Sequence, residues 1–295
     1  ECYGEFGLPI HLSEVSIPSF GNDPEDEQLQ AELTKRLFKL WFSRKHCEAI
    51  VWWNMADGTA YGGWQRQKNA PSIQQCIEEA LETVLGTPCH IVGAGRTDAG
   101  VHAYGQVANF KIDTDKSPEE VMDYINQYLP EDIAVISIEE MHERFHSRLN
   151  AKGKTYCYRI WNSPLRNVFE RKYVYELSER LDIEAMKDAA QYFVGKHDFK
   201  AFTSNKKSKK STVRTIYSID IDYSETKEGY KDITITYNGD GFLYHMVRIL
   251  TGTLIEVGLG QRKPEEMKKL FENATRDMAG ALAPAKGLCL MEVRY

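Results

Sequence analysis

Segments of two different hydrophobic periods follow one another along most of this chain, and this alternation restricts the fold more than any other feature. Apolar residues recur at helical spacing from Ile73 to Leu85, with Ser72 as an N-cap and Gly86 as a stop. Every second residue is apolar in three runs, which predicts strands over Tyr156–Ile160, Ile219–Tyr223 and Ile233–Tyr237. A chain that mixes both kinds of segment in this way folds as an α+β protein.

The same two patterns predict the other elements. Helices are expected from Ser117, over Asp182–Val194 and from Pro264, and strands over Ile133–Ile138 and Leu288–Val293. The helix from Ser117 is expected to bury Val121, Tyr124, Ile125 and Tyr128. The length of 295 residues exceeds what one hydrophobic core usually fills. We therefore predict two half-domains of split βαβ, or ferredoxin-like, type (residues 45–150 and 151–295) around a central cleft, preceded by an extension over residues 1–44.

Charge is distributed very unevenly in this chain, whose formal net charge is −6. Residues 1–34 contain eight acids and no Lys or Arg, so removing that −8 from the total leaves +2 for residues 35–295. Seven bases and one acid lie between Lys196 and Thr215. This run is a candidate phosphate-binding patch, with Lys206, Lys207, Lys209, Lys210 and Arg214 as the predicted phosphate contacts. A solvated loop without a ligand is the alternative.

The cysteines and the hydropathy exclude several classes of protein. The six cysteines form no CxxC pair and no Cys/His cluster at zinc spacing, so we expect reduced thiols and no metal site. No apolar run approaches the roughly 20 residues that span a bilayer, and no basic segment precedes an apolar one at the N-terminus. These features predict a cytoplasmic protein that does not contact a membrane.

A glycine-rich turn over Gly93–Ala103 carries the most chemistry. Its three glycines surround Arg96 and Asp98, so the turn presents one base and one acid to a cleft. The turn contains neither GK[ST] nor GxGxxG, so it is neither a Walker A nor a Rossmann loop. By residue type alone, an aspartate in a loop more often stabilises its own turn than acts as a catalyst.

Seven segments, taken together and in order, resemble the motifs of TruA-type tRNA pseudouridine synthases. They are Gly63–Gln67, Gly93–Ala103, Phe145–Arg148, Lys154–Arg159, Gly195–Phe199, Gly241–Arg248 and Ala283–Leu288. The resemblance covers about residues 57–295 and implies the pseudouridine synthase fold. It also implies that a homodimer converts uridine to pseudouridine in the anticodon stem-loop of tRNA, at tRNA positions 38–40, without a cofactor or a metal.

The resemblance assigns roles to individual residues of these motifs. Asp98 is implied to be the catalytic carboxylate, acting at C1′, at uracil C6 or on the C2′ proton, with Arg248 as its ion-pair partner. Arg96 would fill the stack that a flipped-out uridine leaves, and Tyr156 would stack on the flipped base. Leu243 would form a wall of the pocket.

Several neighbours of these residues are interpreted as structural. Tyr158 faces the same side of its strand as Tyr156, and we expect it to be part of the core. His102, His197 and His245 are expected to be structural histidines beside the cleft rather than general acids, because the first step of pseudouridylation needs no solvent nucleophile.

Residues 1 to about 61 do not fit this family. They resemble the last part of a family-10 xylanase, with Glu14 at the nucleophile position and a helix over Leu29–Ser43, and Ala56 stands where the synthases have Tyr. A retaining glycosidase needs a second carboxylate about 5 Å away, from a barrel strand that this chain lacks. A β-glycanase is therefore the weakest alternative function. The other is an RNA-binding protein whose synthase core is impaired by the altered first strand.

Overall fold

The computed structural model describes residues 56–111, 116–139, 141, 144–204, 210–272 and 274–295, together with two short strands nearer the N-terminus. These strands, β1 (His11–Leu12) and β2 (Ala49–Ile50), pair in parallel within a unit that spans Glu1–Trp53. A second unit spans Asn54–Tyr295. The predictions that lie outside the described residues concern Glu14, the helix Leu29–Ser43, and Lys206, Lys207 and Lys209.

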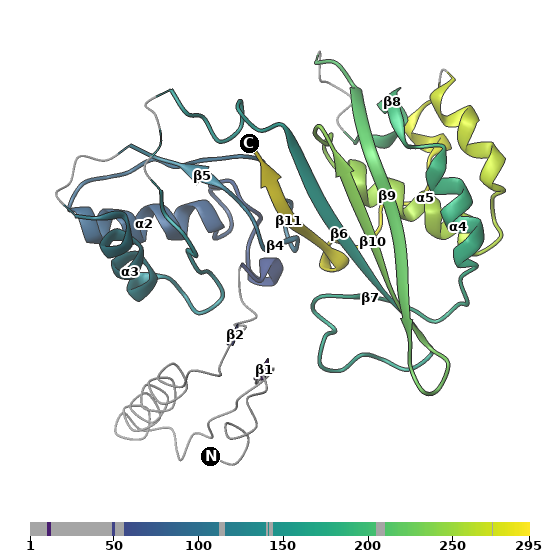
Figure 1. The fold of residues 1–295 in the computed structure, drawn as a ribbon, viewed down its shortest axis with the longest axis horizontal. Coiled ribbons are helices and arrows are strands. Elements are labelled where there is room, and N and C mark those ends of the chain that lie inside the picture. The colour runs from purple at the N-terminus through teal and green to yellow at the C-terminus, as the bar shows by residue number, and fades with distance from the viewer. Residues whose placement is uncertain are drawn as a thin grey trace. The chain divides into compact units, whose positions relative to one another are not determined.

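A seven-stranded sheet runs through the second unit (Figure 1). Its strands follow the order β4-β11-β6-β10-β9-β8, and β7 also pairs with β6. Their bounds are β4 (His102–Ala103), β6 (Gly153–Asn162), β7 (Tyr175–Leu177), β8 (Gly195–Asp198), β9 (Val213–Glu225), β10 (Lys231–Gly239) and β11 (Leu288–Arg294). The register sets Tyr237 opposite Tyr156 and Ile235 opposite Tyr158, so alternate residues of the long strands share one apolar face.

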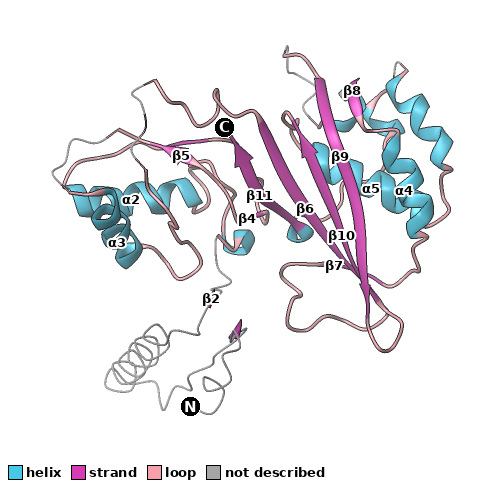
Figure 2. Ribbon diagram, in the orientation of Figure 1, coloured by secondary structure: helices cyan, strands magenta, loops and turns pink. Residues whose placement is uncertain are grey.

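Two helices, α4 (Ile183–Gln191) and α5 (Met246–Gly258), cover this apolar face (Figure 2). The Tyr237 hydroxyl on β10 and the Thr251 hydroxyl on α5 hydrogen-bond across the interface at 2.8 Å. The sequence patterns do not predict α5. Apolar side chains occur all around this helix and nearly all are buried, so it shows no one-sided stripe.

A smaller core lies in the N-terminal half of the second unit. There α2 (Ile73–Leu85) packs against α3 (Pro118–Tyr128), and β3 (Val92–Gly93) pairs with β5 (Ala108–Asn109). Buried members of this core include Ile73, Leu81, Ile91, Val121 and Ile125. The glycine-rich turn that follows β3 leads into β4, which pairs with β11, so the turn connects this half to the large sheet.

Short 3₁₀ helices complete the described part of the second unit. They are η2 (Gly58–Ala60), η3 (Lys200–Phe202), η4 (Pro264–Phe271), η5 (Arg276–Met278) and η6 (Ala285–Gly287). The helix predicted from Pro264 is thus a 3₁₀ helix. The predicted caps of α2 are confirmed: the Ser72 side chain accepts from Gln75 N–H, and Gly86 is left-handed with φ 70°. Among the described residues, no helix combines the length and apolar character that crossing a membrane requires.

Two predictions for the N-terminal half are wrong. Residues 133–138 form no strand, because the Asn126 side chain of α3 takes the place of a strand neighbour: its amide donates to Val135 O and accepts from Val135 N–H, both at 2.8 Å. Tyr124 and Tyr128 are 41% and 56% exposed instead of buried. The face of α3 that the rest of the fold covers is therefore narrower than its apolar stripe.

Candidate active site

A cleft of about 810 Å³ in the second unit is lined by every described residue that was predicted to contact the substrate. These are Arg96, Asp98, Tyr156, Lys210, Arg214, Leu243 and Arg248. Arg96 and Asp98 belong to the glycine-rich turn, Tyr156 belongs to β6, and Arg248 lies in the first turn of α5. Asp98 and Arg248 are 150 positions apart in the chain, so the packing of α5 on the sheet brings them together.

The glycine-rich turn is held in place by the segment that precedes α2. Trp64 N–H donates to Thr97 O and Gly100 N–H donates to Gly58 O, both at 3.1 Å. A side chain at residue 58 would place its Cβ 2.2 Å from Val101 O, and Gly63 has a φ of 101° with its own Cβ site 2.5 Å from Thr97 O. Only glycine fits at these two positions, so the close approach of the backbones fixes the turn before any substrate binds.

The Asp98 carboxylate is held through one of its two oxygens. Arg248 Nη1 donates to Asp98 Oδ2 at 3.2 Å, and Arg248 is itself held by its Nε donating to Ala283 O at 2.7 Å. His245 Nε2 lies 3.4 Å from the same Oδ2. Among the described residues, no group donates to Asp98 Oδ1. This oxygen therefore has no hydrogen-bond donor from the described part of the chain.

Tyr156 forms an apolar wall of the cleft beside Asp98. Its ring meets the ring of Phe242 edge to face, with centroids 5.3 Å apart. Burial, and secondly the Asp98 charge, raise the pKa of the Tyr156 phenol, so the group stays protonated. Tyr158 is fully buried and its hydroxyl donates to Pro284 O at 2.8 Å, in agreement with its predicted place in the core.

The cleft is electropositive. Its lining contains six Lys or Arg side chains and two Asp side chains. Lys154 is one of the six and was not among the predicted site residues. It lies two positions before Tyr156 on β6, and its Nζ donates to Ala94 O at 2.8 Å. Burial, together with the nearby Arg148 charge, lowers the pKa of Lys154 to about 8. The feature of the sequence that could have identified Lys154 is its position in the Lys154–Arg159 motif.

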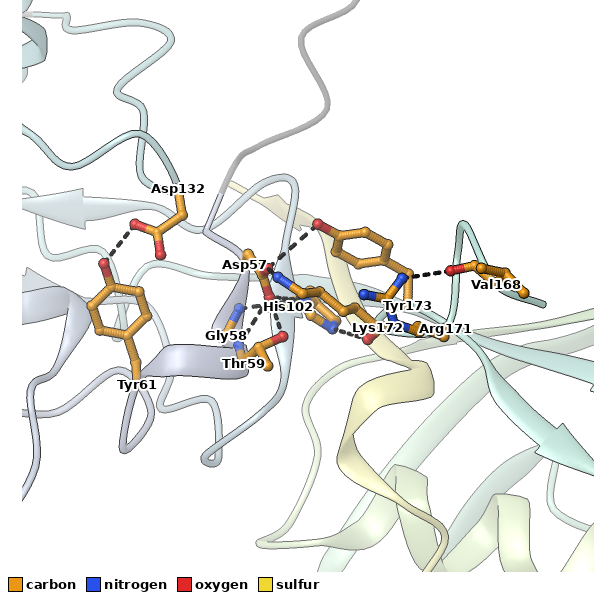
Figure 3. Close-up of polar contacts among 10 residues, drawn as sticks. All are labelled: Asp57, Gly58, Thr59, Tyr61, His102, Asp132, Val168, Arg171, Lys172 and Tyr173. Carbon is orange, nitrogen blue, oxygen red and sulfur yellow. Dashed lines mark hydrogen bonds and ion pairs between the residues drawn. The ribbon is translucent and has the colours of Figure 1, made fainter. Parts of the chain in front are cut away.

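A second aspartate, Asp57, lies in a cluster of polar contacts with Thr59, His102, Lys172 and Tyr173, which we call the Asp57 cluster (Figure 3). Asp57 Oδ1 accepts from the backbone N–H of Thr59 at 3.0 Å and from the Thr59 hydroxyl. Asp57 Oδ2 accepts from Lys172 Nζ at 3.2 Å and from the Tyr173 hydroxyl at 3.4 Å. Both oxygens are thus occupied, and Asp57 is not part of the cleft lining.

The three histidines differ in their surroundings. His102 is buried, accepts from Gly58 N–H through Nδ1 at 3.1 Å, and therefore donates from Nε2 to Lys172 O. His197 stacks on Phe271 with ring centroids 4.4 Å apart. Both contacts fit the predicted structural roles. His245, in contrast, lies in the cleft against Asp98.

Comparison with known proteins finds similar sequences over most of this chain. A family model described as tRNA pseudouridine synthase matches residues 54–149 and 189–295. tRNA pseudouridine synthase A of Bacillus sp. (strain KSM-64) is 48% identical over 240 residues, which is 81% of this chain and 96% of the relative.

Two further relatives carry the name tRNA pseudouridine synthase A 2. The one from Clostridium perfringens is 46% identical over 239 residues, and the one from Bacillus anthracis is 45% identical over 240 residues. Each alignment covers 81% of this chain and 96% of the relative. With the basic cleft and its paired aspartate, these matches show that the chain belongs to the tRNA pseudouridine synthase family.

Proposed function

We propose that this chain converts uridine to pseudouridine at positions 38–40, in the anticodon stem-loop of tRNA, with Asp98 as the catalytic carboxylate. The observation that carries this proposal is the state of that carboxylate. Arg248 holds Oδ2 at 3.2 Å, while no described residue donates to Oδ1, in a cleft walled by Tyr156. An ionised carboxylate with one oxygen free can act as a nucleophile or as a base.

The reaction balances within the substrate itself. The bond from N1 of uracil to C1′ of ribose breaks and a bond from C5 to C1′ forms. The proton on C5 leaves and N1 gains one, so no oxidant or co-reactant is consumed. Attack of Asp98 on C1′, attack on C6 and removal of the C2′ proton are all compatible with a free Oδ1.

Access to the uracil requires flipping it out of the anticodon stem, at a cost of a few kcal/mol. Tyr156 and Leu243 offer apolar surfaces to the extruded base, and Tyr156 can stack on it. Arg96, exposed at the cleft, can fill the vacated position in the stack. Lys210 and Arg214 line the same cleft, and together with Lys206, Lys207 and Lys209 they supply positive charge for phosphates.

The experiment that tests this proposal is release of tritium from tRNA labelled at uracil C5. Formation of the C5–C1′ bond displaces that label, whereas binding alone does not. We expect release by the full chain and none by Asp98→Asn. tRNA binding without release would favour the alternative of an RNA-binding protein with an impaired core.

The arrangement of the chain is part of the same proposal. We propose a cytoplasmic homodimer in which tRNA contacts both subunits, with split βαβ halves over residues 45–150 and 151–295 and an extension over residues 1–44. Sedimentation of the free protein and of its tRNA complex tests the dimer. The xylanase resemblance adds no second function, because a retaining glycosidase needs a partner carboxylate for Glu14.

A further inference from the structure

We propose that His245 is a positioning residue for Asp98, oriented by Ser204, and that it holds the carboxylate so that only Oδ1 faces the reaction. This inference rests on the proposed function of Asp98 and adds two side chains to it. It replaces the structural role that the sequence predicted for His245.

The backbone at His245 is the first observation. His245 has a φ of 66°, and in the described residues only Ala56 is another non-glycine residue with positive φ. The left-handed region is unfavourable for a residue with a Cβ. His245 is also the N-cap residue of α5, yet its side chain makes no capping hydrogen bond. His245 thus has an unfavourable backbone conformation and does not cap the helix, which suggests that its side chain is selected for other contacts.

The contacts of the imidazole show where it is needed. Nε2 lies 3.4 Å from Asp98 Oδ2, and Nδ1 lies 2.9 Å from Ser204 Oγ. Ser204 is anchored in turn, because its N–H donates to Tyr244 O at 3.4 Å. The Tyr244 ring stacks on the imidazole with centroids 3.7 Å apart. The side chain of His245 is only 15% exposed, so these neighbours determine its orientation.

The neighbours also determine the tautomer. A carboxylate only accepts, so the ring nitrogen that faces Asp98 must carry the hydrogen, and Nδ1 must then accept from the Ser204 hydroxyl. Burial lowers the pKa of His245; the Asp98 charge opposes this, while Arg248 and Arg276 reinforce it. The neutral form with hydrogen on Nε2 therefore predominates at neutral pH. In this form Nε2 carries its hydrogen 3.4 Å (N to O) from Oδ2, beside the hydrogen bond that Arg248 makes to the same oxygen.

Two side chains that contact the same oxygen restrict rotation of the carboxylate. Arg248 alone could hold Asp98 in several torsions, whereas Arg248 and His245 together keep Oδ2 turned away from the substrate side. A displacement of about 1 Å in such a group lowers the rate about 100-fold. Protonation of His245 would strengthen its hold on Asp98 and weaken the carboxylate as a nucleophile, so the activity should also fall at acidic pH.

Amide substitutions separate the two imidazole contacts. The amide nitrogen of Gln can occupy the position of Nε2, and the shorter Asn can reach only the position of Nδ1. We expect His245→Gln to keep kcat within about 5-fold of the parent, and His245→Asn and His245→Ala to lose about 10- to 100-fold with little change in KM for tRNA. His245→Gly, which fits a φ of 66° without strain, should lose kcat equally while thermal stability is kept.

His197→Gln is the matched control, because His197 contacts Phe271 and Val194 O instead of Asp98. It should leave kcat and its pH profile unchanged. The acidic limb of that profile should shift in His245→Gln. Equal kcat values for His245→Gln and His245→Asn would overturn the proposal.

A readout that needs no turnover separates this inference from the proposed function. Nitrogen-15 NMR of the histidine rings should show His245 with its hydrogen on Nε2 near neutral pH, and Asp98→Asn should lower the pKa of His245 further by removing the opposing charge. If the parent releases no tritium, the proposed function fails, and the NMR result alone decides the contact. A pKa of His245 that does not move in Asp98→Asn shows that the contact is absent.

Discussion

Asp98 and Asp57 each lie beside a histidine, but their carboxylates are in opposite states. Asp98 uses one oxygen for Arg248 and His245, and its side chain is 21% exposed in the cleft. Asp57 has donors on both oxygens and is 9% exposed. The difference between the two aspartates is therefore the free oxygen of Asp98 and not the neighbouring histidine, which both of them have.

The histidines differ in the same way. His245 Nε2 lies 3.4 Å from Asp98 Oδ2, whereas His102 Nδ1, 3.6 Å from Asp57 Oδ1, accepts from Gly58 N–H and has no hydrogen to offer the carboxylate. Burial acts to raise the pKa of Asp57, but hydrogen bonds from Thr59 and the Lys172 charge hold it below the usual 3.8. The contacts of the Asp57 cluster thus stabilise the ionised form of its carboxylate. In the cleft, by contrast, one oxygen of Asp98 has no donor among the described residues.

The largest expected effect separates the two aspartates by activity. Asp98→Asn keeps the side-chain volume and removes the charge, so tritium release should fall at least about 1,000-fold while tRNA affinity and stability stay near the parental values. Single-turnover assays with labelled tRNA measure this. Residual activity within tenfold of the parent would remove Asp98 from the catalytic role.

Asp57→Ala should show the reverse pattern. It leaves the Lys172 ammonium, the Tyr173 hydroxyl and the Thr59 N–H without their acceptor, and breaking a fully buried pair costs about 3–5 kcal/mol. Because Lys172 is half exposed, we expect the free energy of unfolding to fall by about 2–3 kcal/mol. Urea unfolding measures the loss, with Asp98→Asn as the control. Parental stability in Asp57→Ala would contradict the structural role.

The salt dependence of tRNA binding compares the lysines of the cleft side with the lysine of the Asp57 cluster. Replacing Lys206, Lys207, Lys209 and Lys210 by Ala should weaken tRNA binding about 10- to 100-fold and reduce the slope of log K against log salt by about 3. Lys172→Ala removes a cation from the Asp57 cluster and should leave the slope unchanged. An equal change of slope in both variants would mean that the cleft does not direct RNA binding.

The smallest effect concerns the buried histidine. Burial lowers the pKa of His102 below 6.5, with the Asp57 charge opposing, so between the two values the unfolded chain binds a proton that the folded chain does not. This contribution to stability is present above pH 6.5 and is lost as the pH falls toward the folded pKa, by up to about 1.4 kcal/mol per pH unit.

In His102→Gln, the free energy of unfolding should no longer show this dependence on pH, as measured by urea unfolding between about pH 5 and 8. His245→Gln measures how much His245 contributes to the pH dependence of the free energy of unfolding. That contribution has the same sign, because the pKa of His245 is lowered as well. A parental pH dependence in His102→Gln would show that the slope arises elsewhere.

Elements with local causes were predicted well from the sequence. The start and end of α2 depend on Ser72 and Gly86, and the predicted start of α3 at Ser117 is confirmed, with Ser117 and Glu120 forming a capping box. The predicted strand over Ile133–Ile138 failed because the side chain of Asn126 satisfies the backbone there. The apolar helix α5 left no period in the sequence, since tertiary packing covers all of its faces.

The sequence by itself determined the α+β character, the glycine-rich turn with Arg96 and Asp98, and, through its motifs, membership in the synthase family. Only the tertiary structure decided which oxygen of Asp98 is held and by which groups. Arg248 and His245 reach that oxygen because α5 packs on the sheet with its first turn at the cleft, and Ser204 orients His245 from another loop. Such distances depend on contacts between distant segments, for which hydrophobic periodicity and residue spacing contain no information.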